Sequence, residues 1–81
     1  MANKDIVIRD KETFIEKTVK AGLSYRQLAE KANISQTTIS LIANGERNPS
    51  PKTAINICKA LNCQFEDIFF IENDYKSNQT N

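Results

Sequence analysis

The stretch from Ser35 to Ala43 reads SQTTISLIA and carries no charged side chain. At helical spacing it places Ile39 and Ile42 on one side, where they can be buried. A solvated helix face ordinarily carries Glu and Lys, whereas this one offers short uncharged groups. Such groups match the donors, acceptors and methyl groups that base edges present in the major groove of DNA. The residues on this outer face are Gln36, Thr37, Ser40 and the apolar Leu41.

Local signals predict that this stretch is the second of two short helices joined by a tight turn. Ser24 is a good N-cap for the first helix, and Gln27 three residues later completes a capping box. Asn33 then supplies a residue that tolerates the left-handed backbone of a sharp turn. Ser35 is the expected N-cap of the second helix, which ends near Gly45.

The two helices resemble the helix-turn-helix of Cro/C1-type (XRE family) regulators, over roughly residues 23–69. Asn33 stands where many members have Gly, a departure that the backbone tolerates. The resemblance implies an all-α fold: a compact five-helix Cro/C1 repressor-like domain. The residues that carry it are Leu28, Ala29, Asn33, Ile34, Ile39, Ile42, Asn44 and Gly45, followed by Asn48-Pro49-Ser50 and Asp67-Ile68-Phe69.

The remaining segments predict a helical domain over residues 10–71, preceded by an arm or short strand over residues 1–9. The run DIVIR at residues 5–9 favours a strand, and pairing with Phe69-Phe70-Ile71 would form a small β-ribbon from the N- and C-terminal segments. The alternative is a loosely ordered arm. Residues 72–81 are polar and are expected to form a disordered tail.

Three further helices are expected around the helix-turn-helix. Asp10 should cap a helix that runs to about Ala21, with Phe14, Ile15, Thr18 and Val19 on its inner side. Ser50 and Pro51 should open the next helix, which runs to about Leu61 with Ala54, Ile57, Cys58 and Leu61 inward. A short helix over about 65–69 would close the core with Phe65 and Ile68.

Composition narrows the function classes. The 81 residues suffice for one domain, and no apolar run approaches the length of a membrane span. The N-terminus lacks the apolar core of a signal peptide, so a cytoplasmic location is expected. There is no His, no Gly-rich phosphate loop and no metal-ligand cluster in the sequence, so neither an enzyme nor a cofactor is expected. Cys58 and Cys63 are expected to be buried, reduced thiols.

The net charge of +1 is small for a nucleic-acid-binding protein, but its distribution is uneven. Residues 24–53 carry four basic and two acidic side chains, whereas residues 64–81 carry one basic and four acidic ones. One reading is ordinary surface variation. The other is that the helix-turn-helix half approaches phosphates and the opposite end avoids them.

The DNA-binding interpretation assigns a role to each polar residue by position. Gln36 is the strongest base reader, because its amide can pair with N6 and N7 of adenine; the alternative is that it only braces the first helix. Leu41 could pack on a thymine methyl or make a peripheral core contact. The base-reading set is Ser35, Gln36, Thr37, Ser40 and Leu41. Tyr25 and Arg26 open the first helix near the DNA strand, and the resemblance adds Thr38, Asn44, Arg47, Asn48 and Lys52 as phosphate contacts.

The leading hypothesis is a sequence-specific transcriptional repressor that binds a palindromic operator on double-stranded DNA as a homodimer, typical of a phage or mobile element. Its expected dimer interface is Phe69, Phe70 and Ile71, unless these residues complete the monomer's core. No small-molecule ligand is expected. The alternatives are a protein-interaction module on the same scaffold and an antitoxin or restriction-control regulator.

Overall fold

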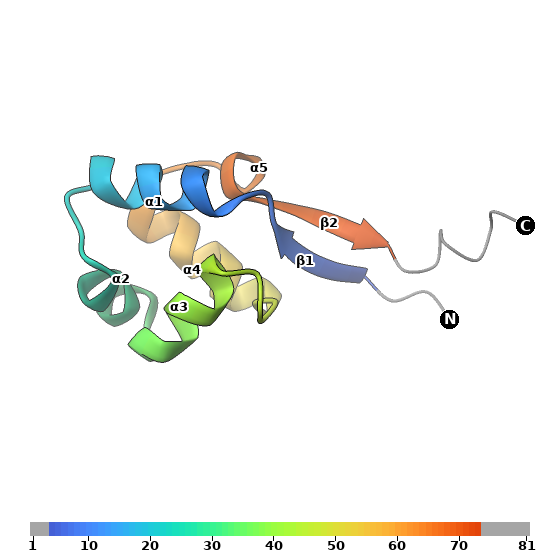
Figure 1. Cartoon of the computed structure of the whole chain (residues 1–81), viewed down its shortest axis with the longest axis horizontal. Helices are drawn as coiled ribbons and strands as arrows, with labels where there is room; N and C mark the ends of the chain where they lie inside the picture. The colour runs from blue at the N-terminus through green and yellow to red at the C-terminus, as the bar shows by residue number, and fades with distance from the viewer. Residues whose placement is uncertain (1–3, 74–81) are drawn as a thin grey trace, which may run out of the picture.

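The structure, a computed structural model, describes residues 4–73 of the chain as five helices and two strands (Figure 1). The five helices and the small ribbon agree with the fold that the sequence predicts. The predicted disorder of residues 74–81 lies outside the described residues. In chain order the elements are β1 (Lys4–Ile8), α1 (Lys11–Lys20), α2 (Tyr25–Ala32), α3 (Gln36–Ala43), α4 (Pro51–Leu61), α5 (Phe65–Ile68) and β2 (Phe69–Asn73).

Each of the four longer helices is preceded directly by the residue that the sequence predicts as its N-cap. The side chains of Asp10, Ser24, Ser35 and Ser50 each accept a hydrogen bond from the backbone N–H three residues on. These bonds satisfy amides that have no partner within the helix. The helix starts could be predicted from the sequence because these local hydrogen bonds determine them.

The core lies where α1 and α4 meet the helix-turn-helix pair, and α5 and β2 close it (Figure 1). Its largest fully buried side chains are Phe14, Phe69, Leu28, Ile39, Ile42, Ile57 and Ile68. Each predicted inward residue of α4 is buried, because Ala54, Ile57, Cys58 and Leu61 follow a single helical stripe. The core thus packs against the inner faces of α2 and α3 and leaves their outer faces exposed.

The predicted inner face of α1 is wrong at two positions. Ile15 and Val19 are exposed, and Val19 keeps 68% of its surface accessible. The other two predicted inner residues, Phe14 and Thr18, are buried. Thr18 can be buried because its hydroxyl donates to the carbonyl oxygen of Phe14 at 2.8 Å, which satisfies its polar group inside the helix.

The two strands form an antiparallel ribbon that ties the two ends of the described chain together. Lys4 pairs with Asn73 and Ile8 with Phe69, so the pairing predicted between these segments is confirmed. The first strand spans Lys4–Ile8 rather than residues 5–9, and the second continues through residues 72 and 73, which were expected to begin the tail. At its base the backbone N–H of Arg9 donates to the carbonyl oxygen of Ile68 at 2.7 Å.

Candidate nucleic-acid interface

The turn between α2 and α3 has the backbone that its sequence predicts. Asn33 adopts the left-handed conformation, with φ 63° and ψ 42°. The next amide, that of Ile34, donates to the carbonyl oxygen of Ala29 at 3.0 Å. Ala29 is itself buried, and its small side chain lets the helices approach closely. The turn therefore fixes the direction in which α3 leaves α2.

The outer face of α3 presents the uncharged side chains that the sequence singles out. Gln36 and Thr37 are exposed, and Ser40 and Leu41 are half-buried beside them. Ile39 and Ile42 lie fully in the core on the opposite side. Among the described residues, no hydrogen bond engages the side chain of Gln36, Thr37 or Ser40. These groups therefore point outward with their hydrogen-bonding capacity unused.

Two hydroxyls assigned to DNA contact by the sequence are engaged within the helix cap. The Ser35 hydroxyl accepts from the backbone N–H of Thr38 at 3.0 Å. It also lies 2.8 Å from the Thr38 hydroxyl. A hydroxyl that caps a helix has less capacity left for an outside partner. Ser35 and Thr38 thus have a structural role of their own in addition to the contacts predicted for them.

The start of α2 offers further donors beside this face. Its capping box engages the amides of Ser24 and Gln27. Arg26 is exposed and lies 3.9 Å from Glu30, a separation that leaves it loosely held. Tyr25 packs edge-on against Phe14, with ring centroids 6.0 Å apart. Burial raises the pKa of Tyr25, so its hydroxyl remains a neutral hydrogen-bond donor.

The remaining predicted phosphate contacts lie in and just after the loop that follows α3. The carbonyl oxygen of Leu41 accepts from the amides of Glu46 and Arg47, at 2.8 and 3.2 Å, which folds the loop back on α3. The backbone at Gly45 has φ 78°, which glycine adopts without strain. The predicted side chains in and after this loop are all exposed: Asn44, Arg47, Asn48 and Lys52.

Comparison with known proteins agrees with this geometry. A family model described as helix-turn-helix matches residues 16–68, well over half of the chain. The chain belongs to the XRE-type helix-turn-helix family. It is 32% identical over 59 residues to YgzD of Bacillus subtilis, covering 73% of this chain and 89% of that protein. It is 40% identical over 53 residues to MJ0272 of Methanocaldococcus jannaschii, covering 65% and 80%. Both relatives are described as uncharacterized HTH-type transcriptional regulators.

Solved structures of regulators share the fold of this helix-turn-helix protein. The restriction-modification controller C.AhdI of Aeromonas hydrophila superposes with a TM-score of 0.65 at 21% identity, over 70% of this chain and 86% of its own. The clp gene regulator ClgR of C. glutamicum gives 0.64 at 23% identity, over 70% and 73%. These structures share the fold, while family membership makes the chain a transcriptional regulator with a DNA-binding fold, of a family that is not enzymatic.

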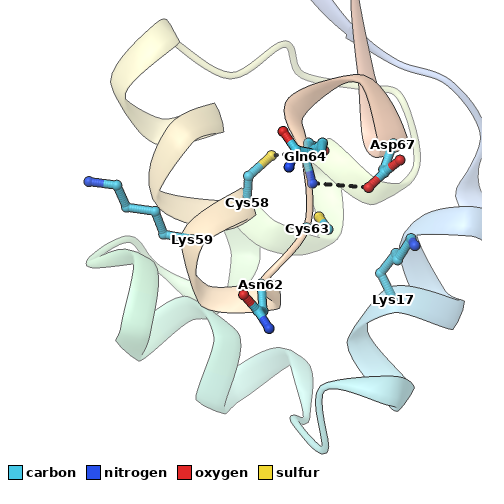
Figure 2. Close-up of a pocket in the computed structure, with 7 residues that line it drawn as sticks. All are labelled: Lys17, Cys58, Lys59, Asn62, Cys63, Gln64 and Asp67. Atoms are coloured by element: carbon cyan, nitrogen blue, oxygen red, sulfur yellow. Dashed lines mark hydrogen bonds between the residues drawn. The ribbon is translucent and has the colours of Figure 1, made fainter.

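The cysteines of this helix-turn-helix regulator line a hollow of about 430 Å³, together with Lys17 of α1 and Asp67 of α5 (Figure 2). Cys58 is buried and Cys63 is half-buried; both are free thiols. Burial raises the pKa of Cys58 to about 12 and also raises that of Cys63. Within residues 4–73 no cluster of three or more potential ligands could hold a metal ion. Burial therefore favours the neutral form of both thiols at neutral pH.

The three residues predicted to form a dimer interface have different surroundings. Phe69 is fully buried in the chain's own core, whereas Phe70 and Ile71 are exposed. Sequence reasoning missed a further exposed apolar residue, Ile55, which lines an apolar hollow beside the ribbon. The available signal was its phase, because Ile55 lies off the buried stripe of α4. Among residues 4–73 no helix has both the length and the apolar character of a membrane span.

Proposed function

We propose that this chain is a sequence-specific repressor that binds a palindromic operator as a homodimer, with α3 in the major groove. The observation that carries the proposal is the outer face of α3, where the exposed side chains of Gln36 and Thr37 make no hydrogen bond within the described chain. Polar groups held outward on a rigid helix, with no charge beside them, suit the recognition of base edges. The proposal assigns base reading chiefly to Gln36, Thr37 and Ser40.

Gln36 is the most informative of these residues. It occupies the first position of α3, and residues at the start of a recognition helix reach the bases. Its amide can accept from N6 and donate to N7 of adenine, and a good bidentate pair is worth about 1–3 kcal/mol of discrimination. Leu41 and the methyl group of Thr37 can contact thymine methyl groups. Ser35 contributes chiefly by capping the helix that carries these readers.

Phosphate contacts would fix the helix in its groove. Arg26 and Tyr25 lie at the start of α2, and Arg47 lies in the loop after α3. The amides of the first turn of α2 add donors there, since a helix N-terminus favours an anion. The exposed Asn44, Asn48 and Lys52 extend this frame along the loop, and Thr38 would be a minor member because its hydroxyl lies in the cap.

A homodimer follows from the small footprint of one such domain. A single recognition helix reads only a few base pairs, and symmetric pairs place two helices one DNA turn apart, about 34 Å. A palindrome is the DNA sequence that matches this symmetry. Repression then requires only that the occupied operator overlaps a promoter, an effect that DNA affinity alone supplies.

The experiment begins by selecting bound duplexes from a random pool, which yields the half-site and its spacing. The Gln36→Ala variant should then lose roughly 5- to 150-fold of its preference for the selected base pair. Arg47→Ala should weaken binding to all duplexes alike and reduce the salt slope by about one unit. Lys59→Ala is the matched control, because Lys59 is exposed on α4 and lines the hollow of Cys58 and Cys63, which holds none of the residues assigned to DNA contact.

Two outcomes would overturn the proposal. If neither Gln36→Ala nor Arg47→Ala changes binding to the selected duplex, the assigned surface is wrong. If the wild-type chain binds no duplex even at low salt, a protein-interaction role on the same scaffold takes its place. An antitoxin or restriction-control role would leave the DNA measurements unchanged, and the genes beside the selected operator would distinguish it.

A further inference from the structure

An apolar groove of about 350 Å³ lies between the ribbon, the start of α4 and α5. Ile6 and Ile71, a cross-strand pair, form one wall. Ile55 stands on the helical wall. Ile55 and Ile71 keep 43% and 58% of their surfaces exposed, so the groove has large apolar side chains on both walls. Its full lining is Lys4, Ile6, Pro51, Ile55, Phe65 and Ile71.

The groove continues the chain's own core outward. Alternate residues of a strand share a face, so Ile71 lies on the same side of β2 as the fully buried Phe69. Phe70 lies on the other side, where the Arg9 guanidinium is 5.6 Å from its ring centroid. The inner side of the ribbon therefore begins in the core at the Ile8–Phe69 pair and extends past the helices at the Ile6–Ile71 pair.

We propose that a second copy of this chain fills this groove, with Ile55 and Ile71 of each copy buried against the other across a twofold axis. The inference rests on the proposed function, and it names the surface that joins the two half-site readers. It places Ile55, Pro51 and Phe65 in the interface, in addition to Ile71. It also assigns Phe69 to the core of each copy and leaves Phe70 on the outer side of the ribbon.

The lining favours an apolar, uncharged partner. Lys4 is the one charged residue among the six that line the groove, so the groove offers little to a nucleic acid or a charged peptide. In a contact across a twofold axis, each copy contributes the same patch. This patch can pair with itself, because it has both exposed isoleucines and a hollow that could receive those of the other copy. The chain's own residues 74–81, DYKSNQTN, are polar and would fill such a groove poorly.

The position of the groove beside the DNA-binding elements favours a second copy over another apolar protein. Pro51 begins α4, directly after the loop that carries Arg47 and Asn48. The same loop lies against the ribbon, since a Cβ placed on Gly45 would be 4.0 Å from the Ile8 side chain. Figure 1 shows this loop between α3 and the base of β1. A partner in the groove would thus lie alongside the same DNA, where a palindrome requires a second α3.

Sedimentation velocity at micromolar concentration tests the inference. The wild-type chain should sediment at about twice its 9.2 kDa mass. The Ile55→Glu variant, which places a charge in the groove without breaking the helix, should raise the dimer dissociation constant by roughly 100-fold. Val19→Glu is the matched control: Val19 is more exposed than Ile55 and lies on α1, outside the groove, so its dimer should be unchanged. Circular dichroism and urea unfolding establish that both variants fold.

Binding to one selected half-site separates this inference from the proposed function. Ile55→Glu should keep the base preference on a single half-site and lose the additional affinity that the full palindrome gives the wild type. A wild-type chain that remains a monomer both alone and on the palindrome would overturn the inference, as would a dimer unaffected by both Ile55→Glu and Ile71→Lys. Absence of any base preference in the wild type would instead overturn the proposed function, while the sedimentation result still decides the groove.

Discussion

Replacing Asn33 tests whether the turn before α3 depends on a left-handed residue. An L-residue with a Cβ loses about 1–2 kcal/mol in this conformation, which Asn offsets in part and Gly avoids. Gly itself costs roughly 0.5–1 kcal/mol of stability, because it has more conformational freedom to lose when the chain folds. At φ 63°, Asn33→Ala should therefore be about 1 kcal/mol less stable than Asn33→Gly. For a domain of this size that difference corresponds to roughly 4–8 °C in Tm.

Asn62 supplies the matched control within the same chain. It ends α4 with φ 55° and ψ 50°, nearly the conformation of Asn33, but lies outside the turn that joins α2 and α3. Asn62→Ala should lose stability to a similar extent relative to Asn62→Gly. Only Asn33→Ala should also weaken binding to the selected duplex, because relaxation of its turn changes the angle between α2 and α3.

Urea unfolding and a titration of the selected duplex measure both effects. Equal stability of Asn33→Ala and Asn33→Gly would refute the argument that the backbone conformation selects the residue. Equal loss of DNA affinity in Asn33→Ala and Asn62→Ala would show that general destabilisation is responsible and that the turn has no special part in aiming α3.

Three further outcomes follow from the structure. The hydrogen bond from the Thr13 amide lowers the pKa of Asp10. The stability from this contact is therefore present above the unfolded pKa near 4 and is lost as pH falls through the lower folded value. In Asp10→Asn, the free energy of unfolding measured in urea should fall less steeply with acid than in the wild type. Phe14→Ala should cost about 3–5 kcal/mol by urea unfolding, because Phe14 is fully buried. With its pKa raised to about 12, Cys58 should be alkylated at pH 8 roughly a thousandfold more slowly than a free cysteine, as mass spectrometry can follow.

The helix boundaries were predictable because local chemistry decides them. Asp10, Ser24, Ser35 and Ser50 carry short acceptors that reach the amide three residues on, and this reach depends on nothing distant in the chain. The turn at Asn33 was predictable for the same reason. Pairing of the terminal strands was also foreseen, because branched residues at one end and apolar residues at the other are natural partners.

The inner face of α1 was only half predictable, because burial there depends on what packs against the helix. Ile15 and Val19 look more apolar than Thr18, yet Thr18 is the buried residue, since its hydroxyl bonds within its own helix. The register of a short helix with apolar residues on two sides is set by neighbouring elements. Hydropathy alone cannot identify the side on which those elements lie.

The sequence predicted which residues of the candidate site lie on the surface, but not the role of each side chain. Gln36 and Thr37 project outward as expected, because Ile39 and Ile42 determine the phase of α3. Whether a hydroxyl such as that of Ser35 caps a helix or meets DNA depends on its rotamer, which spacing does not fix. The apolar groove depends on three separate segments meeting in space, and no local pattern contains that information.

The ribbon also bears on how the chain folds. Its strands are far apart in sequence, with Ile8 opposite Phe69, so closing the loop between them is entropically costly until the helices have shortened the distance. During synthesis β1 emerges before the five helices of the described residues, and β2 emerges after them. The core position of Phe69 therefore stays open until β2 has left the ribosome, and we expect the nascent domain to complete its packing only then.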